Sequence, residues 1–156
     1  MTVDTQLDPD SNYYNNIIHH VDNCDYFDEE TFKRLTQTYK DTNFSILHLN
    51  IRSILNKHDD LVAYLDSLEY KFSVIGLTET WLKNENINDF PLSQYSFTGK
   101  VRDQKPGGGI GLYIHQSCQF RERNDLSINV DDIIESQFVE LTEPNNIIVG
   151  VIYRPL

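Results

Sequence analysis

Apolar residues recur with two different periods after residue 43, and the alternation of these periods predicts the first elements of the fold. The stretch "FSILHLN" (44–50) is an apolar-rich strand candidate, and "FSVIGL" (72–77) is a continuous apolar run of the length of a buried strand. Between them, "NKHDDLVAYLDSLEY" (56–70) has the period of an amphipathic helix. Its apolar positions at helical spacing are Leu61, Leu65 and Leu68. The pattern predicts a β-α-β unit.

The rest of the chain is predicted to be mostly strands. Five further candidates cover 95–99, 109–114, 118–123, 133–141 and 146–153. Their spacing is typical of an all-β layer, with turns at "QKPGGG" (104–109) and "TEPNN" (142–146). The glycine-rich segment is interpreted as a tight turn entering a strand, because the "LYIH" that follows does not begin a helix and a phosphate-binding loop would require one.

Residues 1–43 differ from the rest in composition and have only weak periodicity. These features predict an acidic, partly disordered leader with one short helix at 29–39 and a boundary near residue 43. The leader holds nine acidic and three basic residues, against fifteen and ten in 44–156, for a net charge of −11. The remainder is therefore not basic, which argues against tight nonspecific DNA binding but leaves a metal-assisted site open.

Length and composition predict one domain or a piece of one, since 156 residues with 39% hydrophobic content can bury a core. Two cysteines, no secretory signal and no apolar stretch of the roughly 18–20 residues that a bilayer span requires predict an intracellular protein, nuclear or cytoplasmic and not secreted. His19, His20 and Cys24 resemble a loose metal cluster, but they lack a second ligand pair and are interpreted as solvated leader residues.

Two polar residues stand at the ends of the strands of the β-α-β unit. Asn50 ends the first strand, and Glu79 follows the second. If these strands are neighbours, both side chains emerge on one rim of the sheet, where an amide and a carboxylate would supply oxygen ligands to Mg²⁺. The alternative is that Glu79 caps a turn. Tyr153, at the end of the last strand, either hydrogen-bonds a phosphate or closes the core.

The succession "FSILHLNIRSI", "FSVIGLTETWL", "KPGGGIGLYI", "ESQFVEL" and "GVIYRPL" resembles the first half of the endonuclease/exonuclease/phosphatase superfamily. It is most similar to the apurinic-endonuclease-type domain of non-LTR (LINE-like) retrotransposons, over residues 44–156. The resemblance implies an α/β fold, a four-layered α/β sandwich of which about the first half is present.

The resemblance also implies roles for individual residues. Asn50 would orient the metal site, Glu79 would bind Mg²⁺ with Mn²⁺ as the alternative, and Tyr153 would approach the scissile phosphate. The residues that would contact the DNA backbone are Arg52, Ser53 and Arg154. The implied reaction is phosphodiester hydrolysis that leaves a 3′-hydroxyl to prime reverse transcription. The implied partners are target DNA and a downstream reverse transcriptase domain of the parent polyprotein, with no membrane.

The family's remaining catalytic segments, "G-D-F-N" and "S-D-H", lie downstream of its "Y-x-P" motif, whereas this sequence stops at Leu156. His48, His58 and His115 match none of the family's catalytic positions. We therefore expect half of an active site, inactive as this chain alone. The alternatives are a non-catalytic remnant or interaction fragment and another phosphodiesterase branch of the superfamily, the latter disfavoured by "TETWL" and "NIRS".

Overall fold

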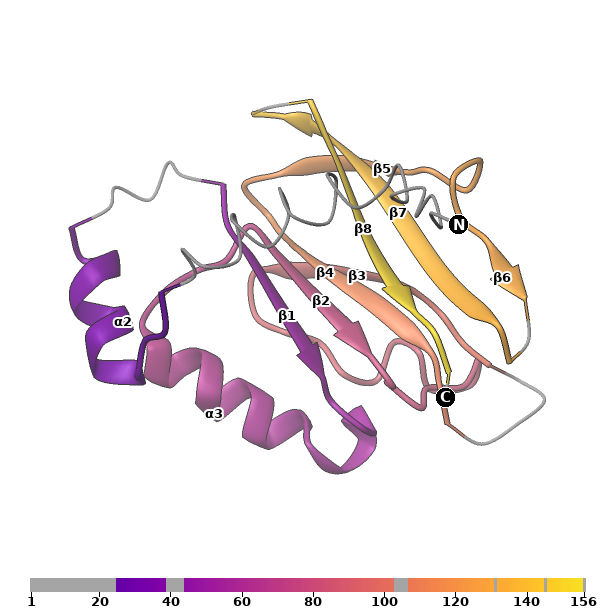
Figure 1. The fold of residues 1–156 in the computed structure, drawn as a ribbon, viewed down its shortest axis with the longest axis horizontal. Coiled ribbons are helices and arrows are strands. Elements are labelled where there is room, and N and C mark those ends of the chain that lie inside the picture. The colour runs from indigo at the N-terminus through magenta and orange to yellow at the C-terminus, as the bar shows by residue number, and fades with distance from the viewer. Residues whose placement is uncertain (1–24, 39–43, 103–106, 131, 145, 156) are drawn as a thin grey trace, which may run out of the picture.

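The computed structural model describes residues 25–38, 44–102, 107–130, 132–144 and 146–155 (Figure 1). The leader residues 1–24, with His19, His20 and Cys24, and the predicted boundary near residue 43 lie outside these ranges. The helical elements are α2 (Glu29–Thr36), the 3₁₀ turn η1 (Ile54–Asn56) and α3 (His58–Leu68). The strands are β1 (Ile46–Asn50), β2 (Val74–Thr78), β3 (Tyr95–Lys100), β4 (Ile110–His115), β5 (Gln119–Glu122), β6 (Asn129–Val130), β7 (Ile134–Glu143) and β8 (Ile147–Tyr153).

The predicted β-α-β unit is confirmed, since β1 and β2 are parallel neighbours and α3 lies between them in the chain. Their register pairs Asn50 with Thr78. The first sheet has the strand order β1-β2-β4-β3, with β4 antiparallel to both of its neighbours. In the second sheet, β7 pairs antiparallel with β5, β6 and β8.

The strands predicted after residue 95 are present, but they do not form one layer. β3 and β4 return to the first sheet, and only β5 to β8 form the second. The reason is burial: five consecutive residues of β4, from Ile110 to Ile114, are buried, so this strand requires a sheet neighbour on each side and cover on each face. The short exposed strand β6 was not predicted.

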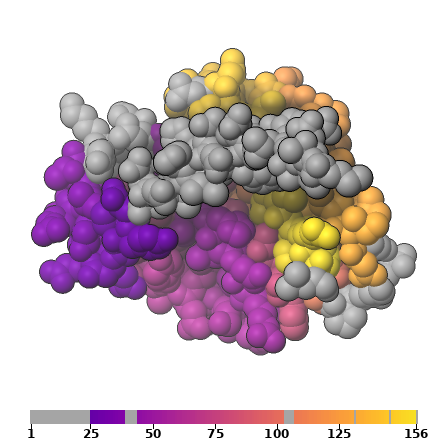
Figure 2. All heavy atoms as spheres, in the orientation of Figure 1, coloured from indigo at the N-terminus to yellow at the C-terminus, as the bar shows by residue number. Residues whose placement is uncertain are grey.

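The core has two parts, one on each face of the first sheet. On one face, Ile75 and Leu77 of β2 pack with α3 residues such as Leu61 and Leu68. On the other face, Val74 packs with residues of the second sheet, so the two sheets lie face to face. Figure 1 and the space-filling view of Figure 2 show the helices on one side of the molecule and the second sheet on the other.

Helix α2 begins where Asp28 caps it, because the Asp28 carboxylate accepts a hydrogen bond from the Thr31 backbone N–H at 2.8 Å. It ends at Thr36, before the predicted limit of 39. Phe32 of this helix contacts Tyr70 and Phe72, with ring centroids 5.7 and 6.0 Å apart, so this part of the acidic segment packs on the domain. In the described ranges, no helix is long and apolar enough to cross a membrane.

Candidate active site

Three strands that carry predicted site residues end at the same edge of the molecule. β1 and β2 are parallel and in register, so the chain leaves both of them at one rim. β8, from the second sheet, runs to the same end (Figure 1). Asn50 is the last residue of β1, Glu79 follows the last residue of β2, and Tyr153 is the last residue of β8.

These three side chains meet at one carboxylate oxygen. The Asn50 amide Nδ2 donates to Glu79 Oε1 at 2.9 Å, and the Tyr153 hydroxyl donates to the same oxygen at 3.2 Å. The partners are 29 and 74 residues apart in the sequence. Among the described residues, none donates to the second oxygen, Oε2. Glu79 is half-buried, and its carboxylate therefore has one oxygen fixed by protein and one available to a ligand.

The phenol of Tyr153 is held in its protonated form. Partial burial raises its pKa above the ordinary value, and the neighbouring Glu79 carboxylate, to which it donates, raises the pKa further. Tyr153 is therefore a hydrogen-bond donor at neutral pH. Tyr153 packs against the core between the sheets, as one of the two sequence interpretations expects, and its hydroxyl also reaches Glu79.

The turns that carry the site have an uncommon backbone conformation. Arg52, Ser53, Glu79 and Trp81 all have positive φ, at 45°, 82°, 55° and 56°. Residues other than glycine adopt this region at a cost of order 1 kcal/mol or more each, and such residues are concentrated at functional sites. Their clustering at one rim indicates that the surrounding structure imposes the geometry of the site.

Backbone hydrogen bonds between the two turns maintain this conformation. Ser53 N–H donates to the Glu79 carbonyl at 2.7 Å, and Ile54 N–H donates to the Thr80 carbonyl at 3.0 Å. On the opposite side, Thr80 N–H and Trp81 N–H donate to the carbonyls of Gly109 and Gly108, at 3.1 and 2.9 Å. The Glu79 turn is thus fixed between the segment after β1 and the glycine-rich turn before β4.

A buried ion pair anchors the glycine-rich turn, and sequence reasoning missed it. Arg102 Nε donates to Glu135 Oε1 at 2.6 Å, and Gly109 N–H donates to Glu135 Oε2 at 2.7 Å. The two side chains are only 11% and 10% exposed. The predicted strand 133–141 contained a clue, because Glu135 shares its inward face with Val139 and Leu141. Nothing in the sequence identified Arg102 as its partner.

The residues predicted to contact DNA differ in their exposure to solvent. Arg52 and Arg154 are exposed, and neither forms an ion pair with another described residue. Ser53 is 3% exposed, so its side chain is not available to DNA in this conformation, and its described contribution is the backbone hydrogen bond to Glu79.

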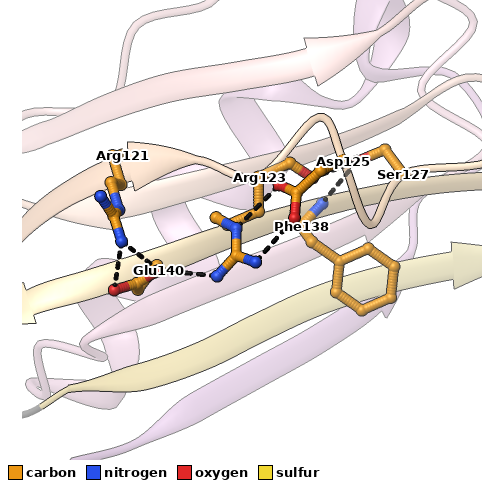
Figure 3. A network of polar contacts seen from close by, with 6 residues as sticks. All are labelled: Arg121, Arg123, Asp125, Ser127, Phe138 and Glu140. Atoms are coloured by element: carbon orange, nitrogen blue, oxygen red, sulfur yellow. Dashed lines mark hydrogen bonds and ion pairs between the residues drawn. The ribbon is translucent and has the colours of Figure 1, made fainter.

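Two other arginines, on the outer face of the second sheet, form ion pairs with carboxylates (Figure 3). Arg121 and Arg123 both donate to Glu140, and Arg123 also donates to Asp125. These hydrogen bonds lower the pKa of Glu140, which remains ionised. The network neutralises the arginines locally, so it does not form a basic surface for phosphates.

The chemistry of the site suits a hydrated hard cation. In the described part of the chain, no group of three or more His, Cys, Asp or Glu side chains could enclose a metal ion. Mg²⁺ does not require such a group, because it commonly keeps several waters and uses one or two carboxylates with a substrate phosphate. Oε2 of Glu79, which accepts no hydrogen bond from another described residue, lies at an exposed rim and fits that requirement.

No protein-family model matches the chain, and no curated protein matches it. Among solved structures, it is similar to the AP endonuclease LMAP from Leishmania major, with a TM-score of 0.53 and 14% sequence identity over 83% of this chain. The chain spans about half of that protein, 48% of its length. The predicted α/β fold is therefore confirmed: two sheets with few helices, arranged as in part of an AP endonuclease.

Proposed function

We propose that this chain carries one side of the active site of a Mg²⁺-dependent DNA endonuclease. The observation that carries the proposal is the convergence of Asn50, Glu79 and Tyr153 on one carboxylate oxygen. The fold supports it, because one similar solved structure is an AP endonuclease. Mn²⁺ is the alternative metal, since it also prefers oxygen ligands.

Each residue has a distinct role in this proposal. Glu79 binds the metal through Oε2, while Asn50 holds Oε1 and so fixes the orientation of the carboxylate. Tyr153, kept protonated, donates to Glu79 and, when DNA is bound, to a phosphate oxygen. Arg52 and Arg154 contact the DNA backbone from the same rim. The bound Mg²⁺ supplies polarisation of the phosphoryl oxygen and stabilisation of the leaving oxygen.

The finer assignment is to the non-LTR retrotransposon type, and it rests on the sequence segments "LNIRS" and "TETWL". In that case the product is a nick whose 3′-hydroxyl primes reverse transcription. The partners are target DNA and a reverse transcriptase domain of the same polyprotein, and the protein acts in the nucleus or cytoplasm. A non-catalytic interaction fragment is the second candidate function, and the acidic composition favours it.

The 156-residue chain by itself is expected not to nick DNA. The described site contains one carboxylate, and no described histidine lies among its hydrogen-bond partners. Positioning and deprotonating the attacking water contributes roughly 10²- to 10⁴-fold in rate. In this proposal those groups belong to a longer protein that includes this chain, and the 48% coverage of the AP endonuclease structure supports the proposal.

Terbium luminescence tests the metal site without requiring activity. Tb³⁺ occupies oxygen sites of hard cations, and the only tryptophan of the chain, Trp81, lies two residues from Glu79, where it can sensitise the ion. We expect saturable Tb³⁺ emission that excess Mg²⁺ suppresses, and at least about tenfold weaker binding in Glu79→Gln. Glu85→Gln, which removes an exposed carboxylate nearby in sequence, is the control and should bind like the wild type.

Relaxation of supercoiled plasmid, with Mg²⁺ or with EDTA, tests the reaction. We expect nicking by a longer protein containing the complete site, loss of nicking in its Glu79→Gln variant, and none by residues 1–156. Unchanged Tb³⁺ binding in Glu79→Gln, or full activity of that variant in the longer protein, would refute the metal-ligand role. Strong Mg²⁺-dependent nicking by the 156-residue chain would refute the incomplete site.

A further inference from the structure

Trp81 lies at the surface beside the candidate site. It is the only tryptophan in the chain, it follows Glu79 by two residues, and it is 38% exposed. An indole has a large apolar face and a polar N–H, so its exposed part forgoes a share of the stabilisation that full burial would provide. The core residues on either side of it in the sequence, Thr80 and Leu82, are buried, so the exposure is particular to Trp81.

The backbone that carries the indole is held in place. Trp81 has a φ of 56°, and its N–H donates to the Gly108 carbonyl at 2.9 Å. Thr80, immediately before it, is completely buried and is hydrogen-bonded to the segments on both sides of the turn. Because the backbone is anchored, little conformational freedom of the main chain remains to be lost when a ligand binds to the side chain.

The glycine-rich turn lies close to one part of the ring. A Cβ atom on Gly107 would lie 3.7 Å from the Trp81 Nε1 atom and 3.8 Å from Cε2, which is ordinary van der Waals contact. At the next residue, a Cβ on Gly108 would lie 2.6 Å from Cζ of Arg102, so the guanidinium occupies that side. The indole therefore lies beside the turn and is partly open to solvent.

From these observations, we propose that Trp81 stacks on a nucleobase adjacent to the phosphate that the site binds, and that the preferred ligand is DNA with an unpaired base. This inference rests on the proposed function and extends it to the recognition of substrate. Stacking requires an accessible base face, which single-stranded or locally opened DNA offers and an intact duplex does not.

The negative net charge of the chain explains why a stacking contact at Trp81 matters for DNA binding. The chain has a net charge of −11, and Arg121 and Arg123 are engaged by carboxylates, so phosphate neutralisation supplies little affinity. Arg52 and Arg154 are exposed cations at the rim. Base stacking on an aromatic side chain is much less dependent on charge, and it would provide a large share of the binding.

The test compares two oligonucleotides with the same phosphates. One is an eight-residue oligothymidylate, and the other is an abasic oligomer of the same length, each with a fluorescent label for anisotropy. Titrations use the 156-residue chain at low salt with Mg²⁺. We expect the oligothymidylate to quench Trp81 emission and to bind more tightly than the abasic oligomer, by about 5- to 150-fold.

Variants identify the residue responsible. Trp81→Ala should abolish the difference between the two oligomers, and Trp81→Phe should retain part of it. Tyr64→Ala is the matched control, because Tyr64 is an aromatic residue of α3 with nearly the same exposure, 37%, and should leave the ratio of affinities unchanged. Circular dichroism verifies the fold of each variant.

Equal affinity for the two oligomers, or binding of neither, overturns the stacking role. The Tb³⁺ measurement separates this failure from failure of the proposed function. Glu79-dependent Tb³⁺ binding without discrimination between the oligomers rejects the stacking role and leaves the metal site intact. Discrimination that depends on Trp81 without Glu79-dependent Tb³⁺ binding rejects the metal site and supports the stacking role.

Discussion

Replacing Glu135 by glutamine should both destabilise the fold and loosen the candidate site. Glu135 is the common acceptor for Arg102 and for the Gly109 N–H, so it connects β7 to the turn that holds Thr80 and Trp81. Glutamine has the same shape but no charge. The substitution therefore leaves the Arg102 guanidinium, which is 11% exposed, without its main counter-charge.

The expected magnitude follows from this burial. Removing one partner of a buried ion pair typically costs about 3–5 kcal/mol, because the remaining charge stays desolvated. Asp132 compensates in part, since its carboxylate lies 4.0 Å from Arg102 Nη1 and is half exposed. We therefore expect the lower limit, about 3 kcal/mol. With a urea m-value of about 1–3 kcal/mol/M, the midpoint should fall by about 1–3 M.

Urea unfolding followed by two probes measures both effects. Far-UV circular dichroism reports on the sheets, and the emission of the single tryptophan reports on the turn that Glu135 anchors. In Glu135→Gln, the midpoint should fall for both probes, and Trp81 emission should shift toward that of a solvated indole even without urea. Glu85→Gln removes a carboxylate that is 77% exposed and lies 3.9 Å from Lys83, and it should change neither. An unchanged midpoint and unchanged native emission in Glu135→Gln would contradict the anchoring role.

Three further predictions concern other parts of the structure. Gly109→Ala should lower the free energy of unfolding by about 1–2 kcal/mol or more, because Gly109 has a φ of 80° and a Cβ would lie 2.6 Å from Thr80 Oγ1. Gly76→Ala, where the nearest atoms are 3.7–3.8 Å away, should cost much less in the same urea titration. Strand β8 pairs only with β7 among the described strands, so we expect the chain to associate through this edge at high concentration. Ile152 is exposed on β8, and Ile152→Lys should reduce this association in analytical ultracentrifugation. Unchanged association would exclude this strand as the contact. Burial raises the pKa of Tyr95 to about 12, so the contribution of its protonated phenol to stability is complete below pH 10 and is lost as pH rises toward 12. Tyr95→Phe should therefore reduce the fall of the urea midpoint between about pH 10 and pH 12. An equal fall in both proteins would contradict the assignment.

Local pattern predicted the elements well, because the periods of the apolar residues reflect which faces are buried. The helix at 56–70 and the strand at 72–77 are confirmed as α3 and β2, and the later strands are found close to their predicted limits. One short strand and the end of one helix were not predicted correctly. β6 has two exposed residues and therefore no apolar period, and α2 ends at Thr36 although helix-compatible residues follow it.

The parallel direction of β1 and β2 also followed from the sequence, since a β-α-β unit brings the carboxyl ends of its strands to one rim, and the structure shows that the two strands are neighbours in register. That argument was sufficient to expect Asn50 and Glu79 to lie close together, and the distance of 2.9 Å confirms the proximity. Their catalytic roles remain a proposal.

Long-range arrangement was decided by tertiary structure alone. β4 lies between β2 and β3 and is buried on both faces, but its apolar run predicted only a buried strand and not the sheet that it joins. The contact of Tyr153 with Glu79 spans 74 residues and requires both sheets to be packed. The positive φ values of Glu79 and Trp81 have the same origin: these residues have no local preference for that conformation, and hydrogen bonds from distant segments impose it.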